Sequence, residues 1–392
     1  MVSPSNGVSC VMAPGTGSGH AMVVHVDGQQ SNVLENAISY SPPVLLTFNG
    51  PGANAANTTG GELVIIQGRN FGPAGSSKID AVRYGRAVDT PQDWLHAESC
   101  NVVESHFQIH CRTGVGGGND LRWLVTIDRQ NSTSPTTSYA NPSLHSVEAL
   151  TTGAPVTNGD ANGNEQILLL GSNFGPVGDR LVDQVTFGPH GNQYQLKECT
   201  VTRLSREIMC TTPPGIGQNL RFFVYIAGQR STTAATATFS YASPVIVKTS
   251  ETTVDTVGQS IELIGTNFGL QVPGIGIRVS FGSTILRPST TSQLMGQDTV
   301  RVTIPPLTTS FSPSTNISTL LELTSGSTVL TSLPVSISYN PPYVSNVRFC
   351  CVFFLFFFCG ASCFWFLVHR VLCTEFLWCR FCVSLMIDVP FW

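Results

Sequence analysis

The chain has 392 residues, a length that allows roughly two to four domains. Charged residues make up only 11% of it and the formal net charge is −4, which excludes the strongly basic field that draws a protein to nucleic acid. With 42% hydrophobic residues, the chain has enough apolar side chains to build packed cores, so an intrinsically disordered chain is excluded as well.

Short runs of alternating or β-branched residues recur along the whole chain, separated by clusters of Gly, Pro and Asn. Examples are "ELVIIQG" (62–68), "LRFFVYIAG" (220–228) and "TVRVTIPP" (299–306). No stretch has the length and periodicity of a convincing amphipathic helix. The pattern predicts an all-β protein built from short strands.

The first segment aligns with a later one. "SCVMAPGTGSGHAMVVHVDGQQS" (9–31) matches "MCTTPPGIGQNLRFFVYIAGQRS" (209–231), with Cys10 on Cys210. Residues 1–41 are therefore predicted to be the C-terminal part of a truncated repeat. Met1 lies inside this segment and no apolar signal-peptide core follows it, so we expect the natural start to lie upstream.

Three complete repeats follow, and we call 42–141 repeat 1, 142–243 repeat 2 and 244–341 repeat 3. Four anchors recur in order: an opening proline, a Gly-x-Asn-Phe-Gly loop, a strand ending Val-x-aromatic-Gly, and a tyrosine before the next repeat. The opening prolines Pro43, Pro142, Pro244 and Pro342 are 99, 102 and 98 residues apart. About a hundred residues of short strands is the size of a β-sandwich domain. The chain is predicted to hold tandem sandwiches.

The Gly-x-Asn-Phe-Gly loop follows an apolar strand in every complete repeat. Gly and Asn tolerate left-handed backbone angles, so the chain can turn sharply there. The phenylalanine is then predicted to plug one end of the sandwich core; the alternative is a ligand loop that exposes it. The motif residues are Asn70, Phe71, Gly72, Asn173, Phe174, Gly175, Asn267, Phe268 and Gly269.

Two cysteine pairs have the same spacing. Cys100 and Cys111 are eleven residues apart, and so are Cys199 and Cys210. In "CTVTRLSREIMC" a two-residue turn at 204–205 pairs Cys199 with Cys210, and the first pair obeys the same arithmetic. Cross-strand disulfides are therefore predicted, and disulfides imply an oxidising compartment.

The third repeat lacks both cysteines: Val302 replaces the second, and Thr291 lies near the position of the first. A joint loss is what a bonded pair predicts. The alternatives are buried free thiols or a metal site. Zinc needs four ligands close in space, and no Cys-x-x-Cys or nearby His pair provides them.

Other candidate sites are few. Sequons at Asn57, Asn131 and Asn316 permit glycosylation. The loop "TNGDANGNE" (157–165) is either a solvated loop or a weak calcium site. No catalytic, cofactor-binding or metal-binding residues are predicted, because no Gly-x-Ser-x-Gly elbow appears and no acid pair recurs at matching positions of the repeats.

The last segment, 342–392, opens a further repeat with "PPYVSNV" and then changes character. Residues 349–368 carry no charge and are followed by His369-Arg370, which fits one membrane span with the repeats outside. The composition argues against it, because 350–382 holds seven cysteines and 349–392 holds eleven phenylalanines. The alternatives are a transmembrane helix at 349–368 and a gene-model artefact.

These motifs resemble the IPT/TIG family of immunoglobulin-like domains. The opening Pro, the Gly-x-Asn-Phe-Gly loop, the Cys-x-x-x-Pro-Gly-x-Gly stretch and the closing tyrosine carry the resemblance, which covers about 1–347. Repeat 1 departs from it with "CRTGVGGG", and repeat 3 lacks the cysteines. The resemblance implies tandem immunoglobulin-like (E-set type) β-sandwiches.

The resemblance also bears on function. Family members serve as tandem stalks or ligand-binding spacers of surface proteins, as single domains of transcription factors, or beside the catalytic domain of secreted carbohydrate-active enzymes. The tandem array and the cysteine pairs favour a non-catalytic extracellular or cell-surface protein for adhesion, recognition or support. Its partner would be a protein or glycan ligand, with no nucleic acid. The alternatives are accessory repeats of a secreted enzyme and an intracellular regulator.

Overall fold

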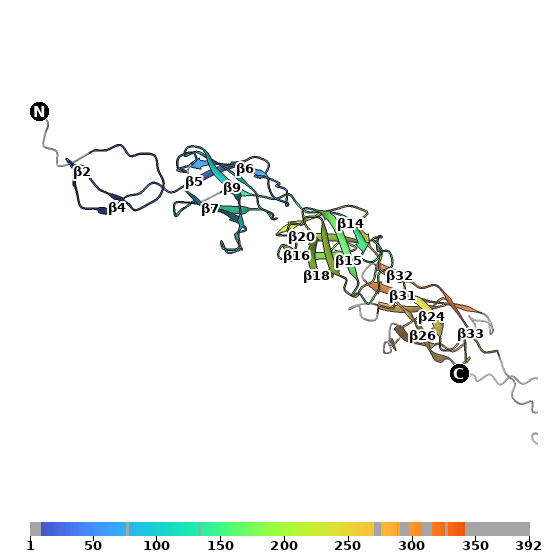
Figure 1. The fold of residues 1–392 in the computed structure, drawn as a ribbon. Helices are drawn as coiled ribbons and strands as arrows, with labels where there is room; N and C mark the ends of the chain where they lie inside the picture. Colours follow the sequence, from blue (N-terminus) through green and yellow to red (C-terminus); the bar gives the residue numbers. More distant parts are fainter. Residues whose placement is uncertain are drawn as a thin grey trace, which may run out of the picture.

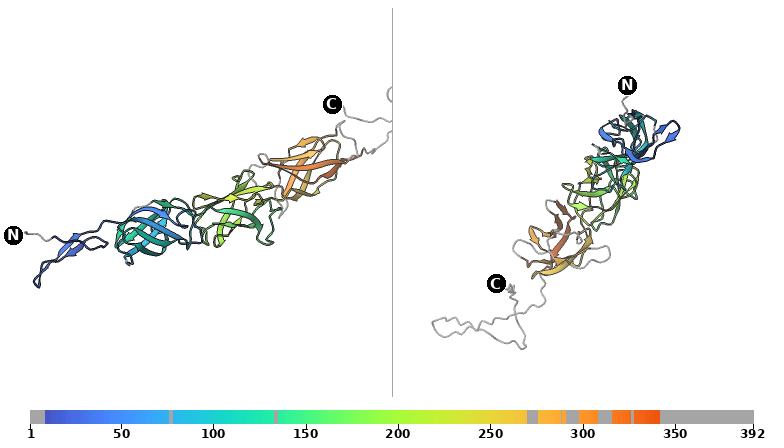
Figure 2. Two further views of the ribbon diagram at one scale, coloured as in Figure 1. Left: turned by 90° about the horizontal axis from the view of Figure 1, so that it is seen from above. Right: turned by 90° about the vertical axis from the view of Figure 1, so that its left-hand side faces the viewer.

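The computed structural model describes residues 9–75, 78–132, 135–269, 276–287, 289–290, 298–307, 316–325 and 328–341. Within these ranges the chain is all-β, with strands and turns and no helix. The strands gather into a row of separate bodies that follow each other end to end, with the N-terminal segment at one end and repeat 3 at the other (Figures 1 and 2). The predicted fold class, tandem immunoglobulin-like sandwiches, is confirmed.

Residues 9–41 form two small antiparallel ladders and no sandwich. In the first, His20 pairs with Ile38 and Met22 with Leu34; in the second, His25 pairs with Gln30. This segment extends beyond the first sandwich as an open ribbon (Figure 1). Its strands are β1 (His20–Met22), β2 (His25–Val26), β3 (Gln29–Gln30) and β4 (Leu34–Ile38).

Repeat 1 consists of two sheets. The first has the order β5 (Val44–Asn49), β6 (Leu63–Arg69), β10 (Gln108–Arg112), β9 (Glu98–Glu104). The second has the order β12 (Gln130–Asn131), β11 (Leu121–Ile127), β7 (Ile79–Gly85), β8 (Leu95–His96), with β13 (Thr136–Thr137) beside β11.

Repeat 2 repeats this plan. Its first sheet has the order β18 (Lys197–Arg203), β19 (Glu207–Thr211), β15 (Gln166–Ser172), β14 (Ser143–Ala149), β22 (Thr232–Thr233). Its second sheet has the order β17 (Tyr194–Gln195), β16 (Val182–Gly188), β20 (Leu220–Ile226), β21 (Gln229–Arg230), with β23 (Thr238–Phe239) beside β20.

Repeat 3 follows with the same two-sheet plan. Its first sheet has the order β24 (Val245–Thr249), β26 (Gln259–Thr266), β30 (Asp298–Ile304), β29 (Ser289–Thr290). Its second has the order β25 (Thr253–Val254), β33 (Val335–Tyr339), β31 (Ile317–Ser325), β27 (Gly276–Phe281), β28 (Thr284–Leu286), with β32 (Thr328–Thr331) beside β31.

Alternation along the strands builds the cores. In β11 the inward residues Leu121, Trp123, Val125 and Ile127 are buried while the residues between them face outward, and β20 shows the same burial pattern. Successive side chains of a strand point to opposite faces, so each sheet offers one apolar face to its partner. Each repeat thus encloses a core cluster of its own.

The predicted start of a further repeat and the hydrophobic segment 349–368 lie outside the described residues. Within the described ranges, no helix has the length and apolar character needed to cross a membrane. The domain boundaries at 42, 142 and 244 stay predictions, and we keep the repeat names for these ranges.

Candidate functional site

The Asn-Phe-Gly loop closes one end of each core. Phe71, Phe174 and Phe268 are fully buried, each within the core cluster of its own repeat. The preceding asparagines have φ between 59° and 66°, the left-handed region that Asn adopts more readily than most residues. The rings therefore lie inside the cores, as core plugs would, and the loop does not expose them.

Each asparagine of the motif also ties its loop to the start of the repeat. The side-chain Nδ2 donates to a backbone carbonyl just before the first strand: Asn70 to Pro42 at 2.9 Å, Asn173 to Asn141 at 3.0 Å and Asn267 to Ser243 at 3.4 Å. The motif thus fixes where one repeat begins relative to its own core.

The first glycine of the motif is required by close packing. A Cβ at Gly171 would lie 2.0 Å from the Ser143 carbonyl oxygen and 2.4 Å from Cζ of Phe174. Gly68 and Gly265 are enclosed in the same way by the first strand and the phenylalanine of their own repeats. Only a residue without a side chain allows the first strand and the ring to approach this closely.

Hydrogen bonds also hold the closing tyrosine at the end of each repeat. The hydroxyl groups donate at 2.6 to 2.8 Å to a backbone carbonyl at one aligned position: Tyr40 to Ala13, Tyr139 to Gly114, Tyr241 to Pro213 and Tyr339 to Pro305. In 9–41 and in repeats 1 and 2 a glycine lies beside the ring; a Cβ at Gly215, for example, would be 2.5 Å from Tyr241. This contact explains the glycine of the Pro-Gly-x-Gly stretch.

Burial shifts the ionisation of these tyrosines. Desolvation is the main cause that raises the pKa of Tyr139 and Tyr241 above the usual value near 10. The Tyr84 hydroxyl lies 2.6 Å from that of Tyr139, and desolvation raises its pKa too. All three groups stay neutral hydrogen-bond donors at physiological pH, which is a structural role.

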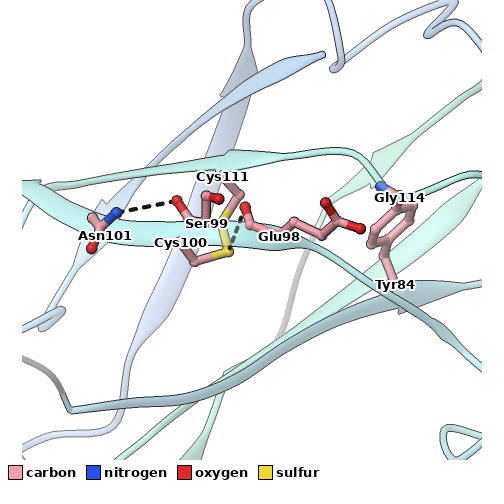
Figure 3. The surroundings of a disulfide bond; sticks show 7 residues. All are labelled: Tyr84, Glu98, Ser99, Cys100, Asn101, Cys111 and Gly114. Atoms are coloured by element: carbon pink, nitrogen blue, oxygen red, sulfur yellow. Dashed lines mark hydrogen bonds between the residues drawn. A yellow bond between two sulfur atoms is a disulfide. The ribbon is translucent and has the colours of Figure 1, made fainter. Parts of the chain in front are cut away.

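Two disulfides join the hairpins. The structure bonds Cys100 to Cys111 and Cys199 to Cys210, with Cα–Cα distances of 4.1 and 4.2 Å. Figure 3 shows the first of them between two neighbouring strands, where Cys100 also contacts the carbonyl of Glu98. These are the two pairs that the sequence predicts.

The hairpin turn differs from the predicted one. Arg203 pairs with Glu207, so the loop spans the three residues 204–206, one more than predicted, with Ser205 at φ 62°. A bulge between Val201 and Arg203 restores the predicted pairing of Val201 with Ile208. The prediction assumed a continuous ladder, and a bulge adds one residue to one strand without moving the apolar face.

Repeat 3 shows what replaces the second cysteine. Val302 is buried opposite Ile261, in the same register in which Cys210 faces Ile167 and Cys111 faces Val64. Thr291 lies outside the described residues. An aliphatic side chain therefore fills the position of the second sulfur, and apolar packing takes the place of the disulfide there.

The other predicted candidates lie on the surface. Asn57, Asn131 and Asn316 are exposed. In the 157–165 loop, Asp160 accepts the Asn162 N–H at 2.8 Å and Glu165 accepts the Asp160 N–H at 3.0 Å. The described part of the chain contains no group of three or more His, Cys, Asp or Glu able to hold a metal ion.

The contacts between repeats 1 and 2, which we call joint 1–2, are a feature that the motif analysis did not single out. Gln229, the first residue of β21, is buried: its Nε2 donates to the Tyr139 carbonyl at 2.9 Å, and its Oε1 accepts the Gly118 N–H at 3.2 Å. The same Nε2 contacts Asn141 Oδ1 at 2.9 Å. One side chain thus binds both the linker and the glycine-rich loop of repeat 1.

Further contacts surround Gln229 at joint 1–2. Arg86 of repeat 1 forms an ion pair with Asp183 of repeat 2 at 3.6 Å, and Arg180 donates to the Asp93 carbonyl at 2.7 Å. A hydrogen bond also joins the buried hydroxyl groups of Thr58 and Ser205. Polar contacts on several sides fix the orientation of one repeat on the other.

Of the two other joints, one repeats this chemistry and one does not. Gln130 repeats the glutamine contact, since its Nε2 donates to the Tyr40 carbonyl at 2.9 Å. In repeat 3 the aligned position is Leu330, and Ile216 of repeat 2 instead packs into the core of repeat 3. The signal was visible in "GQQS", "RQNS" and "GQRS", where one glutamine precedes a recurring serine by two residues.

Comparison with known proteins identifies one repeat. A family model described as IPT/TIG domain matches residues 151–241, inside repeat 2. The predicted resemblance is therefore confirmed, because this segment matches the IPT/TIG domain model. No curated protein sequence matches the chain.

Similar solved structures include one determined with a xylogluco-oligosaccharide, at 14% identity and TM-score 0.31, covering 75% of this chain and 59% of that one. The Plexin A4 extracellular region has 16% identity and TM-score 0.23, covering 79% and 26%. SGBP-B from a xyloglucan utilization locus in Bacteroides uniformis has 12% identity and TM-score 0.20, covering 76% and 100%. The chain spans less than two thirds of the first two structures.

Proposed function

We propose that the chain is a non-catalytic, extracellular or cell-surface array of IPT/TIG repeats that acts as a structural stalk in adhesion or recognition. The observation that carries the proposal is joint 1–2. There the buried Gln229 and the Arg86–Asp183 ion pair fix two successive sandwiches end to end. Bending the joint would separate these groups and leave buried hydrogen-bond partners unsatisfied, which costs free energy. The joint therefore resists bending.

The cysteines support the extracellular part of this proposal. Disulfides in two successive repeats persist only in an oxidising environment such as the secretory pathway. The test is the thiol state of Cys100, Cys111, Cys199 and Cys210 in protein taken from its natural source, measured by alkylation and mass spectrometry. Free thiols at these positions would favour an intracellular regulator instead.

The stalk function is tested by the shape of the full chain in solution. Small-angle X-ray scattering of the wild type should give one extended shape. Gln229→Leu, which introduces the residue of the aligned position in repeat 3, should broaden the distance distribution between repeats 1 and 2. Gln184→Leu, at an exposed glutamine of the same repeat, is the control. An unchanged distribution in Gln229→Leu would contradict the proposed role of the joint.

The ligand of the array would be a protein or a glycan. The proposal that these are accessory repeats of a secreted carbohydrate-active enzyme makes a separate prediction. Purified full chain should then bind a glycan array through its repeats, and the mature transcript should encode a catalytic domain. Adhesion of beads coated with the chain to cells, without binding to the glycan array, would favour a protein ligand.

A further inference from the structure

One loop of 9–41, of repeat 1 and of repeat 2 contacts the repeat that follows it. This is the loop of the Pro-Gly-x-Gly stretch, whose aligned sequences are "APGTG" (13–17), "GVGGG" (114–118) and "PPGIG" (213–217). Its first conserved-place glycine lies beside the closing tyrosine of the same segment. The residue after that glycine, which we call the variable residue, is Thr16, Gly117 or Ile216. Its contacts reach into the following repeat, and they differ from joint to joint.

Thr16 and Gly117 meet two different surfaces. Thr16 Oγ1 donates to Asp128 Oδ2 of repeat 1 at 3.3 Å. A Cβ at Gly117 would lie 3.4 Å from Leu181 Cδ1 and 3.6 Å from Ile226 Cγ2, both in repeat 2. These are ordinary van der Waals distances, so the gap admits one more carbon atom. A branched side chain at Gly117 would have to displace Leu181 or Ile226.

Ile216 reaches furthest into its neighbour. It is 1% exposed and lies in the core cluster of repeat 3, although its backbone belongs to repeat 2. The Tyr194 hydroxyl of repeat 2 donates to the Ile216 carbonyl at 2.9 Å and accepts the Ile216 N–H at 3.1 Å. One hydroxyl group thus holds the loop from behind, while the isoleucine side chain packs across joint 2–3, the contact between repeats 2 and 3.

The following repeat carries a second residue that matches the variable one. Where the variable residue is Thr16 or Gly117, the following repeat has a glutamine that donates to the preceding tyrosine carbonyl. Where the variable residue is Ile216, the aligned residue of the following repeat is Leu330, and both lie in one core cluster. An amide buried against an isoleucine without a partner would cost free energy. Polar or small residues therefore meet the glutamine, and the apolar residue meets the leucine.

We propose that the variable residue selects which repeat can follow, so that neighbouring repeats are matched pairs in a fixed order. Threonine takes a repeat that presents a carboxylate, glycine takes one with a close-packed aliphatic surface, and isoleucine takes one with an apolar recess. Such selection works by building clashes and unpaired polar groups against the wrong partner. It rests on the proposed stalk function only in requiring that joint 1–2 is closed in solution.

The test compares Gly117→Ala with Gly117→Ile in the full chain. The measurement is hydrogen exchange of a peptide spanning 114–121, which contains the Gly118 N–H that donates to Gln229 across the joint. Gly117 has no positive φ, so alanine adds one tolerated carbon and should leave the exchange rate unchanged. Isoleucine should raise the rate by about tenfold or more, because it forces the joint open. Val115→Ile, at a 39% exposed residue of the same loop, is the control.

A second substitution separates the joint from the fold of each repeat. Leu181→Ala removes the side chain nearest to the new group, so adding Gly117→Ile to it should change the exchange rate by less than about twofold. Peptides from β10 and β15 should keep their protection in Gly117→Ile. If these peptides lose protection, or if isoleucine has the same effect with and without Leu181→Ala, the clash does not lie in the joint and the proposal is overturned.

Joint 2–3 provides the reciprocal test. Ile216→Ala, a change in repeat 2, should speed hydrogen exchange in β32 of repeat 3 by about tenfold or more. Ile285→Ala, at a 61% exposed isoleucine of repeat 3, should not. No change in β32 with Ile216→Ala, or full protection of 114–121 in Gly117→Ile, would overturn selection at this position and leave the stalk proposal standing. Rapid exchange of 114–121 in the wild type would overturn both.

Discussion

Replacing Gly171 with alanine is the sharpest test of the repeated loop. Gly171 is the first glycine of the motif in repeat 2. Its substitution places a methyl group against both the first strand and the plug Phe174, without changing charge or polarity. We expect repeat 2 to be destabilised while repeat 1 keeps its stability.

The expected loss of stability in Gly171→Ala follows from the distances to the new Cβ. The new Cβ would lie 2.0 Å from the Ser143 carbonyl oxygen and 2.4 Å from the Phe174 ring, so the strand and the buried ring must both move. Overpacking of a core costs about 1–3 kcal/mol. Because backbone as well as side chain must yield here, we expect a value near the upper end, about 3 kcal/mol. For a repeat of this size that is a fall in Tm on the order of 15 °C.

The assay is hydrogen exchange of the full chain at increasing denaturant, read on peptides from β15 and β19, with peptides from β6 and β10 as an internal reference. Gly153→Ala is the matched control. Gly153 has φ 63° with no atom within 4 Å of a new Cβ, so only the left-handed backbone penalty applies, about 1–2 kcal/mol. If Gly171→Ala costs no more than Gly153→Ala, close packing does not explain the motif glycine.

Three further predictions concern the hairpin and the tyrosines. Replacing Cys199 with threonine and Cys210 with valine, as in repeat 3, should cost repeat 2 about 3 kcal/mol by loop entropy, measured as a lower denaturant midpoint. Burial raises the pKa of Tyr139, so its contribution to the stability of repeat 1 should be fully present below about pH 10 and fall by about 1.4 kcal/mol per pH unit above it, because only the unfolded chain releases the proton. Tyr84, whose pKa burial also raises, should add to this loss. Tyr241→Phe removes the donor to the Pro213 carbonyl and should cost about 1 kcal/mol in repeat 2.

Each of these three predictions has an outcome that would contradict it. Reductant should destabilise repeats 1 and 2 but leave repeat 3 unchanged, and an equal effect on repeat 3 would contradict the disulfide argument. Stability of repeat 1 that stays level from pH 8 to pH 12 would contradict a buried neutral Tyr139. Tyr225→Phe, on the outward side of β20, should be neutral, so a cost equal to that of Tyr241→Phe would deny the hydroxyl its structural role.

Features that recur in every repeat could be predicted from the sequence. Recurrence at one aligned position distinguishes a structural requirement from a chance pattern. Phe71 alone could have belonged to a ligand loop, but three buried phenylalanines at one aligned place fit a common core. The same reasoning found the cysteine pairs, where the hairpin register gave the pairing of Val201 with Ile208. Backbone alternation and turn chemistry are local, so they can be read from short stretches.

The recurring glutamine is visible in the sequence, but its role at the joint could not be predicted, because the contacts there join residues 87 to 147 positions apart through geometry that only the folded repeats create. Gln229 does not belong to an alternating apolar pattern, and its partners are far from it in the sequence. The carbonyl that accepts its hydrogen bond belongs to Tyr139, at the end of another repeat. The position of a bulge could not be predicted from the sequence either. The longer turn at 204–206 came from a bulge that shifts the ladder without altering which residues face the core.

The contrast between the joints bears on how such an array would respond to force or to a ligand. Joint 1–2 is held by directional polar contacts around Gln229, which lose their energy when the repeats rotate by a small angle. Between repeats 2 and 3, Ile216 packs into the neighbouring core and Gln193 contacts Ser325 at 3.2 Å. Apolar contact is non-directional and tolerates rotation as long as the area stays buried. An array built this way would bend between repeats 2 and 3 before it bends between repeats 1 and 2.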